Sequence, residues 1–334
     1  MKYIKYALAV AVLVIAITAV SVNPKKTTQT DFLLDTYVSV TVYGNHKDAA
    51  EQVLKKVRDI HKNYSAYLKD SYVWHMNASP AGQAIPVSEE CFSLLSRAIE
   101  LSKVTCGAFD ITVKPVMDLW DFQGAPHVPE DQALNAALAL VGYQNLVLNA
   151  TDQTVTKQQP DVKIDLGGIA KGYAADCAVD ILLESGVESA VLDFGGNVVT
   201  IGERPLGLFD RIRTGNKTKP FTVGIQSPME VRGTVAATVT ANISPCAVVT
   251  SGGYERSFSE NGKTYHHIIN PKTGKQPENG ILSVTVVSND STAADALSTA
   301  LFVLGEDGVP TASGLYDELI FMMENGEIKR YTKE

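Results

Sequence analysis

The sequence predicts an α+β fold built as a single domain. Its first part carries helical patterns, whereas the part after residue 145 consists mostly of short β-branched runs with only two helical interruptions. Strands and helices that do not alternate regularly favour layered α+β architectures over a doubly wound parallel sheet. The chain has 334 residues, of which 45% are apolar and 20% are charged, so it can bury a large core and its composition is not that of a disordered protein.

The individual elements follow from the spacing of apolar residues. A β-branched and aromatic run predicts the first strand, and apolar stripes at helical spacing predict the helices. Residues 23–31 are polar and indicate a tether. The expected strands are residues 33–43, 162–166, 189–193, 197–201, 221–225, 234–240, 246–250 and 281–288. The expected helices are residues 48–62, a segment from Ser88 to just before Gly107, a segment beginning at Pro129, and residues 169–185 and 292–304.

The N-terminus carries a targeting pattern. Lys2 and Lys5 precede an apolar run over residues 6–22, as in a secretory signal. A run of this length is at the lower limit for a membrane-spanning helix, so a cleaved signal and a retained anchor both stay open, beside a buried core helix. We expect a signal peptide or membrane anchor at residues 1–24, the globular domain at residues 25–334, and a membrane-associated location outside the cytoplasm.

Charge and cysteine content exclude some classes of function. A net charge of −8 without a basic run is poorly suited to binding phosphates of nucleic acids, so we expect no nucleic-acid partner. The cysteines are scattered and form no CxxC pair, so we interpret them mostly as small buried apolar residues and not as a disulfide framework or a metal site. They are Cys91, Cys106, Cys177 and Cys246.

A first candidate site lies at residues 162–176, VKIDLGGIAKGYAAD. An expected strand ends at Asp165, two glycines follow, and a helix then begins with Lys171 in its first turn. Glycines let a backbone approach a ligand, and a helix N-terminus offers free N–H groups to a phosphate. A tight turn with a surface lysine explains the pattern equally well. The segment matches neither the dinucleotide fingerprint nor the P-loop.

A second candidate site lies on the expected helix at residues 292–304, for which Ser291 or Thr292 is the expected cap. Asp295, Ser298 and Thr299 share one face of this otherwise apolar helix. Hard cations such as Mg²⁺ take oxygen ligands and often share them with phosphates of the substrate. The alternative is that both hydroxyls bond back to their own helix while Asp295 caps another element.

Two further segments carry residues suited to a site. His266 and His267 are adjacent, so in a strand only one of them faces a given site, where it could act as a general base. Phe109 and Asp110 follow the end of a helix and could contact a flat heterocycle, although core packing alone also explains Phe109.

Taken in order along the chain, these segments resemble the ApbE family of FAD:protein FMN transferases. No single segment is decisive, but the ordered set is highly specific. Three positions depart from the family pattern, because Leu34 stands where many members have Met, and Asn197 and Asn270 stand where Asp is frequent. The residues that carry the resemblance are Leu34, Asp35, Thr36, Ser65, Tyr67, GAFD at 107–110, Pro115, Trp120, DLGGIAKGYAAD at 165–176, the glycines at 195–196, TSGGYER at 250–256, HIINPKTG at 267–274 and ADALSTALFVLG at 294–305.

The resemblance implies a compact α+β domain related to the T-fold, with FAD in a cleft and Mg²⁺ on its diphosphate. By resemblance, the metal ligands are the backbone carbonyl of Gly168 and the side chains of Asp295, Ser298 and Thr299. The implied FAD contacts are Leu34, Tyr67, Ala108, Phe109, Asp110, Asp165, Lys171 and Ile269. His267 matches the family histidine thought to assist the acceptor hydroxyl.

The implied reaction is phosphoryl transfer. A threonine or serine hydroxyl of an acceptor protein attacks the phosphorus of the FMN moiety, AMP leaves, and FMN stays on the acceptor as a phosphoester. By family analogy the acceptor is an exported or membrane subunit of a redox complex. One alternative is a Mg²⁺-dependent FAD pyrophosphatase, in which water replaces the hydroxyl. The other is a flavin-binding protein without chemistry, against which the Asp295, Ser298 and Thr299 set argues.

Overall fold

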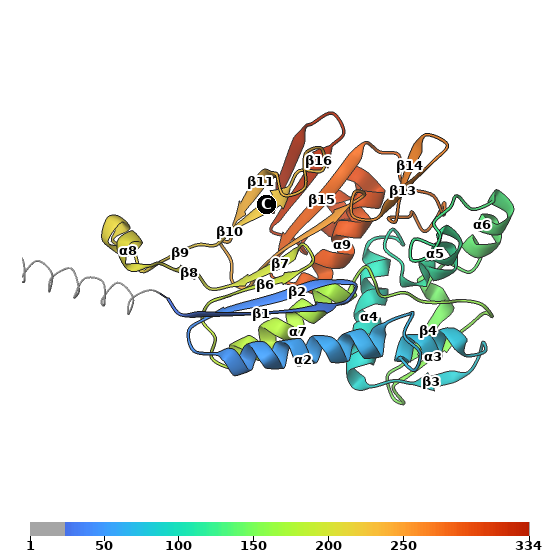
Figure 1. The fold of residues 1–334 in the computed structure, drawn as a ribbon. Coiled ribbons are helices and arrows are strands. Elements are labelled where there is room, and N and C mark those ends of the chain that lie inside the picture. Colours follow the sequence, from blue (N-terminus) through green and yellow to red (C-terminus); the bar gives the residue numbers. More distant parts are fainter. Residues whose placement is uncertain (1–23, 334) are drawn as a thin grey trace, which may run out of the picture.

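An eight-stranded antiparallel sheet organises residues 24–333, the part of the chain that the computed structural model describes (Figure 1). Its strand order is β1-β2-β6-β7-β12-β15-β16-β17. Side chains on alternate positions of β2 are fully buried, so one face of this strand belongs to the core. The strands are β1 (Lys26–Leu33), β2 (Thr36–Tyr43), β6 (Ala190–Phe194), β7 (Asn197–Ile201), β12 (Cys246–Gly252), β15 (Ile281–Ser288), β16 (Glu318–Met323) and β17 (Ile328–Thr332).

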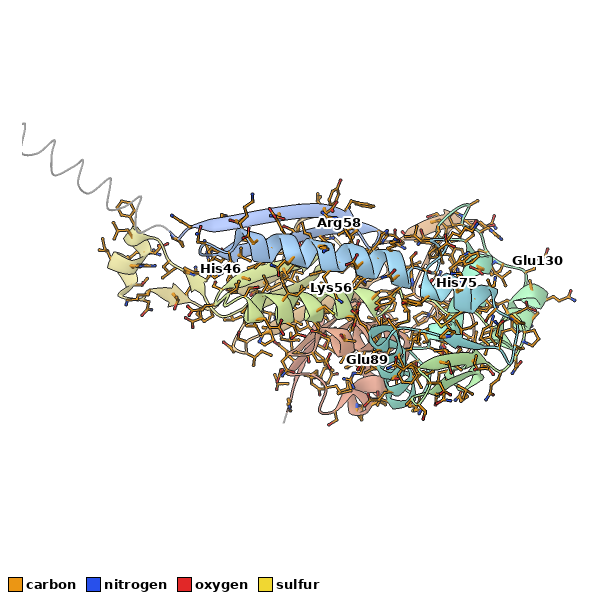
Figure 2. The ribbon with its side chains drawn as sticks, turned by 90° about the horizontal axis from the view of Figure 1, so that it is seen from below. His46, Lys56, Arg58, His75, Glu89 and Glu130 are labelled. Atoms are coloured by element: carbon orange, nitrogen blue, oxygen red, sulfur yellow. The ribbon has the colours of Figure 1, made fainter. Side chains whose placement is uncertain are left out.

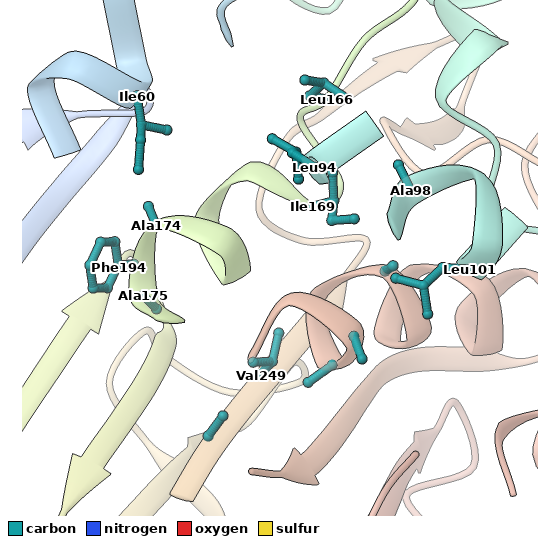
Figure 3. Packing of buried hydrophobic residues seen from close by; sticks show 14 of the residues in the cluster. Ile60, Leu94, Ala98, Leu101, Leu166, Ile169, Ala174, Ala175, Phe194 and Val249 are labelled. Carbon is teal, nitrogen blue, oxygen red and sulfur yellow. The ribbon is translucent and has the colours of Figure 1, made fainter. Parts of the chain in front are cut away.

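Helices cover one face of the sheet. Helix α2 (Lys47–Tyr64) packs on β1 and β2, α7 (Ala170–Glu184) lies between α2 and α9 (Ser291–Leu304), and α4 (Glu89–Val104) packs against α9. Figure 3 shows the apolar side chains that meet in this layer, among them Leu101, Ala174, Phe194 and Val249. These side chains come from four elements that are distant in sequence, so the main core is formed by the helical layer and the sheet together.

Helix α2 forms an outer edge of the helical layer, as Figure 2 shows from below. Lys56 pairs with Glu90 of α4 at 2.6 Å, and Arg58 pairs with Asp31 of β1 at 2.7 Å. These partly exposed ion pairs contribute little stability each, and most of the stability of α2 comes from its buried apolar stripe.

The remaining elements lie around this two-layer body. The hairpin β10–β11 covers the other face of the sheet with a second apolar cluster, and a third cluster surrounds Trp120. These elements are α3 (Tyr72–Ala78), β3 (Ala84–Pro86), η1 (Ile111–Val113), α5 (Lys114–Trp120), α6 (Asp131–Leu138), η2 (Tyr143–Asn145), β4 (Leu146–Asn149), β5 (Thr154–Lys157), β8 (Arg204–Pro205), α8 (Leu208–Thr214), β9 (Thr218–Lys219), β10 (Thr222–Gln226), β11 (Val235–Thr240), β13 (Ser257–Glu260), β14 (Lys263–His266) and η3 (Gly305–Ala312).

The predicted single α+β domain is confirmed, but the prediction at its N-terminal edge was wrong. Residues 23–31 are not simply a tether, because β1 begins at Lys26 and pairs along its whole length with β2. The expected strand at 33–43 is therefore divided by a turn at Leu34 and Asp35, whose φ values are 54° and 59°. A polar, threonine-rich run can form an edge strand, because one side of such a strand stays in solvent. The polar composition of this segment therefore suggested a tether and gave no sign of the strand.

The strand expected at residues 162–166 is absent. Its backbone instead bonds to a side chain. Ile164 donates its N–H to the amide oxygen of Asn77 at 2.7 Å, and its carbonyl accepts from the amide nitrogen of Asn77 at 2.9 Å. Asp165 donates its N–H to the carbonyl of Ile111 at 2.8 Å. An asparagine can thus replace a neighbouring strand, and apolar alternation alone does not reveal this.

Two expected helix starts shift by one or two residues. Helix α6 begins at Asp131, two residues after Pro129. Asp290, and neither Ser291 nor Thr292, is the N-cap of α9, and its side chain accepts from the N–H of Ala293 at 2.7 Å.

The expected signal or anchor at residues 1–24 lies outside the described residues except for Pro24. Between residues 24 and 333, no helix combines the length and apolar character needed to cross a membrane. The cysteines are free. Only Cys91 and Cys246 are buried, whereas Cys177 is half-buried and Cys106 is exposed, so the expectation of mostly buried cysteines holds for two of the four.

Candidate active site

A cavity of about 820 Å³ opens where the β1–β2 turn, the β6–β7 turn, β12 and the N-terminus of α7 approach one another. This volume lies within the range typical of pockets for small molecules and cofactors. Ser298 is the one predicted site residue that does not line this cavity. The predicted residues that line it are Leu34, Tyr67, Ala108, Phe109, Asp110, Asp165, Gly168, Lys171, His267, Ile269, Asp295 and Thr299.

The mouth of the cavity depends on two turns packed closely against each other. Gly195 in the β6–β7 turn has a φ of 64°, and a Cβ there would lie 2.1 Å from the hydroxyl oxygen of Thr36. Only glycine therefore fits at this position. Leu34 in the β1–β2 turn donates its N–H to Nδ1 of His61 at 3.2 Å, which joins this turn to the end of α2.

The segment before α7 brings its backbone to the cavity wall. Asp165 accepts the N–H of Gly167 at 2.8 Å through one oxygen and the hydroxyl of Tyr67 at 3.1 Å through the other. Gly168 lies between Phe109 and Thr299, because a Cβ added there would be 3.2 Å from the Phe109 ring and 3.7 Å from Oγ1 of Thr299. The start of α7 and Thr299 of α9 therefore face the same part of the cavity.

Asp295 is 3% exposed and has three donors around its carboxylate. One oxygen accepts from Nδ2 of Asn197 at 2.9 Å and from Nζ of Lys171 at 3.4 Å. The other accepts from the backbone N–H of Gly172, in the first turn of α7, at 2.9 Å. Asp295 therefore does cap another element, as the structural alternative held, and it also lines the cavity.

The two hydroxyl groups on α9 lie in different surroundings. Ser298 is fully buried, where its Oγ donates to the carbonyl of Asp295 at 2.9 Å and lies 2.8 Å from Oγ of Ser251. Thr299 lines the cavity, and its Oγ1 lies 3.3 Å from the same Ser251 oxygen and donates to the carbonyl of Asp295 at 3.4 Å. Both hydroxyls therefore bond back to their own helix, as the alternative held. Of the predicted side-chain ligands, Asp295 and Thr299 thus reach the cavity, whereas Ser298 lies behind Ser251.

The donor set at the wall suits a hard divalent cation. Asp295, Thr299 and the backbone at Gly168 offer oxygen atoms on one side of the cavity. Within residues 24–333, no group of three or more His, Cys, Asp or Glu side chains could hold a metal by itself. With a single carboxylate, this set fits Mg²⁺ that completes its shell with water and substrate phosphate oxygens.

The two adjacent histidines point in different directions, as predicted. His267 lines the cavity, whereas the ring of His266 packs edge-on against Phe302 with centroids 5.3 Å apart. Burial lowers the pKa of His267 to about 4, and the positive charge of Arg256 adds to this effect. The imidazole of His267 is therefore neutral near pH 7 and can accept a proton.

The aromatic end of the cavity contains Tyr67 and Phe109. The Lys114 ammonium lies 4.2 Å from the centre of the Tyr67 ring, a cation–π contact. The carboxylate of Asp110 accepts from the N–H and hydroxyl of Thr112 and from the N–H of Tyr143, at 2.8, 2.6 and 2.8 Å. Its oxygens are therefore engaged within the fold, so Asp110 supports the wall more directly than it presents a charge to a ligand.

Sequence reasoning assigned no role to three residues at this site. Asn197 donates to Asp295, Ser251 joins the two hydroxyl groups of α9, and Arg256 lies 3.9 Å from Asp35 across the cavity. All three fall in or directly after segments that carry the family resemblance, so position in those segments was the available signal. Their spacing alone indicates no chemistry.

The comparisons with known proteins agree with this geometry. The sequence model of the ApbE family matches residues 34–319. The chain is 32% identical to the FAD:protein FMN transferase of Klebsiella pneumoniae, over 89% of each chain, and 33% identical to that of Treponema pallidum, over 82% of this chain and 78% of the relative.

Solved structures show the same similarity in three dimensions. The crystal structure of the ApbE protein of Thermotoga maritima matches with a TM-score of 0.80 and 34% identity, over 93% of this chain and 97% of the other. The flavin transferase ApbE of Vibrio cholerae matches with a TM-score of 0.76 and 25% identity, over 93% and 98%. By its sequence motifs, its fold and this matched length, the chain belongs to the ApbE family.

Proposed function

We propose that this chain is an FAD:protein FMN transferase. One observation carries the proposal. The start of α7, the Lys171 ammonium and the oxygens of Asp295 and Thr299 lie together at one wall of the cavity. This combination suits a diphosphate, because a helix N-terminus and a cation attract phosphate oxygens while hard oxygen ligands hold a divalent metal between them. The relatives described above, which are FAD:protein FMN transferases and a flavin transferase, support the same activity.

Residues of the chain bind and orient the substrate in this proposal. The Lys171 ammonium at the start of α7 faces the diphosphate, while Tyr67 and Phe109 offer aromatic surface to the flavin or adenine ring. Asp295, Thr299 and the carbonyl of Gly168 would hold Mg²⁺. A bound Mg²⁺ would supply charge neutralisation at the diphosphate.

The proposed reaction forms one P–O bond and breaks another. A serine or threonine hydroxyl oxygen of the acceptor attacks the phosphorus of the FMN moiety, the bond to the AMP oxygen breaks, and AMP leaves. His267 takes the hydroxyl proton, which its neutral state allows. FMN then stays on the acceptor as a phosphoester.

The location and the partner are part of the proposal. Lys2, Lys5 and the apolar run at residues 6–22 support a signal or membrane anchor at residues 1–24, with the catalytic domain outside the cytoplasm. An acceptor on the same side of the membrane fits this location, and by family analogy it is an exported or membrane subunit of a redox complex.

The test is a reconstituted transfer reaction. The full chain in detergent is incubated with FAD, Mg²⁺ and an acceptor domain that carries the target hydroxyl. We expect equimolar AMP and acceptor-bound FMN, seen as flavin fluorescence on a denaturing gel, and loss of both when Mg²⁺ is chelated. AMP with free FMN and an unlabelled acceptor would indicate a pyrophosphatase, and FAD that is retained intact would indicate a binding protein.

A further inference from the structure

A small arm projects from the domain at residues 203–219, and we call it the basic arm (Figure 1). It consists of a two-stranded ribbon, β8 paired with β9, closed by helix α8. No residue of α8 is buried, and Phe209 and Ile212 are 73% and 72% exposed. A seven-residue helix gains little stability by itself, so two large apolar side chains on such a helix indicate a surface that meets something else.

The charge of the arm differs from that of the rest of the chain. It carries five basic and two acidic residues, a net charge of +3, whereas the whole chain has a net charge of −8. The basic residues are Arg204, Arg211, Arg213, Lys217 and Lys219. Exposed apolar side chains flanked by lysine and arginine are typical of segments that lie in the interface of an anionic membrane.

The arm lies at the end of the sheet where the described chain begins. Gly44 donates its N–H to the carbonyl of Lys25 at 2.8 Å, and Tyr43 donates to the carbonyl of Ser189 at 2.9 Å. Ser189 in turn donates its hydroxyl to the carbonyl of Glu203, the first residue of the arm, at 2.8 Å. The apolar run at residues 6–22 and the basic pair Lys25 and Lys26 therefore join the domain beside the arm.

The cavity lies at the opposite end of the same strands. Strand β1 runs from Lys26 to Leu33, and the next residue, Leu34, lines the cavity. Eight residues of strand span about 25 Å at roughly 3.3 Å per residue. A surface that contacts the arm and the start of β1 would therefore lie at the end of the sheet remote from the cavity.

We propose that the basic arm is a membrane contact, in which Phe209 and Ile212 enter the interface of an anionic bilayer and the arm's cations meet lipid phosphates. Together with the N-terminal segment it gives the domain two attachment points and holds the cavity toward acceptors outside the bilayer. This inference rests on the membrane attachment proposed above, and it does not depend on the chemistry in the cavity.

The test places a fluorescent probe on the arm. The full chain with Phe209→Trp is reconstituted in vesicles of phosphatidylcholine and phosphatidylglycerol with brominated acyl chains, and the signal of Trp74 and Trp120 in the unaltered chain is subtracted. Val231→Trp is the matched control, because Val231 is 82% exposed and lies beside Arg232 of the cavity wall. We expect quenching of the Phe209→Trp probe at least about twofold greater than that of the control.

The electrostatic part of the proposal is tested on the same vesicles. Quenching on the arm should decrease when phosphatidylglycerol is left out of the vesicles, and when Arg213→Gln and Lys217→Gln remove two cations of the arm. It should also decrease in high salt, because salt reduces the Debye length from about 10 Å at 0.1 M to about 3 Å at 1 M. A chain that floats with the vesicles but shows no excess quenching on the arm overturns this inference alone. A chain that does not float overturns the membrane attachment as well, while transfer to a soluble acceptor tests the cavity separately. The proposed membrane contact would also be overturned if the probe on the arm is shielded from solvent only when a second protein is added, or only through contacts between copies of the chain.

Discussion

Asp176 and Asp295 cap each other's helices. Asp295 on α9 accepts the N–H of Gly172 at the start of α7, at 2.9 Å. Asp176 on α7 accepts the N–H groups of Ser291 and Thr292 at the start of α9, at 3.0 and 2.7 Å. The two helices can exchange these contacts because they pack closely: a Cβ on Gly172 would lie 2.2 Å from the carbonyl oxygen of Ser291. Of the two, only Asp295 also lines the cavity, so the pair contrasts a purely structural aspartate with one that we propose as a metal ligand.

We expect Asp295→Asn to abolish most of the activity and to lower stability. The proposed metal loses its only charged side-chain ligand, which should reduce FMN transfer and FAD hydrolysis by at least about 10²-fold. Stability should fall by about 1–3 kcal/mol, because the carboxylate also bonds Gly172, Asn197 and Lys171. Thermal unfolding and Mg²⁺-dependent turnover are measured on the same preparation. A destabilised variant with normal turnover per folded molecule would remove Asp295 from the metal site.

The control is Asp176→Asn, which removes the equivalent capping charge without altering the cavity. We expect stability at pH 7 to fall by about 1 kcal/mol and turnover per folded molecule to be preserved. The pKa of Asp176 is raised from 3.8 to about 6, mainly by burial, so the folded chain binds this proton more tightly.

This shift fixes how the cost of Asp176→Asn depends on pH. The stabilisation linked to the proton on Asp176 is present below about pH 4 and is lost as the pH rises through about 6. Asparagine does not titrate, so the variant lacks this contribution. The substitution should therefore lower the free energy of unfolding by about 2 kcal/mol more at pH 4 than at pH 7. Urea unfolding at both pH values measures it. An equal cost at both would show that Asp176 titrates normally in the fold.

We expect His267→Ala to slow FMN transfer by about 10²–10⁴-fold with little change in FAD affinity, as for the loss of a general base. Because the folded pKa of His267 is about 4, below its usual 6.5, the base stays deprotonated in the free enzyme as the pH falls from 7 to 5. A plot of kcat/KM against pH for the unaltered enzyme should therefore show no decrease centred near pH 6.5. His266→Ala is the control, because that ring packs on Phe302 and should affect stability more than transfer. A large loss of FAD affinity with normal turnover would make His267 a binding residue.

We expect Thr299→Val to weaken the apparent Mg²⁺ affinity by about 10-fold or more, since Thr299 lines the cavity and valine keeps its shape. Ser298→Ala should leave the Mg²⁺ requirement nearly unchanged and cost about 1 kcal/mol of stability, because its hydroxyl bonds Ser251 and the Asp295 carbonyl inside the helix layer. Titration of turnover with Mg²⁺ compares the two. If Ser298→Ala weakens Mg²⁺ as much as Thr299→Val, Ser298 is a ligand after all.

Local patterns in the sequence were enough to identify the fold class, the family and most helices and central strands. Apolar periodicity marks helices such as α2 and α9, and β-branched runs mark strands such as β15, because each depends on residues that are neighbours in the chain. The ordered motifs also identified twelve residues that line one cavity. The edge strand β1 was missed because its polar composition resembles that of a tether, although its partner β2 follows directly in sequence. Residues 162–166 were wrongly predicted as a strand because Asn77, which bonds their backbone, lies far away in sequence.

Only the tertiary structure decided which oxygen atoms face the cavity and which are engaged within the fold. In sequence, Ser298 and Thr299 are equivalent hydroxyl groups on one helix face. In the structure both lie near Ser251 of β12, yet only Thr299 lines the cavity. Asp110 differs from Ser298 because it does line the cavity, but its carboxylate accepts from Thr112 and Tyr143. The sequence by itself determined which residues are candidates for the chemistry. Packing between distant elements decided which of them reach the cavity, because burial and hydrogen bonding depend on neighbours that no local pattern specifies.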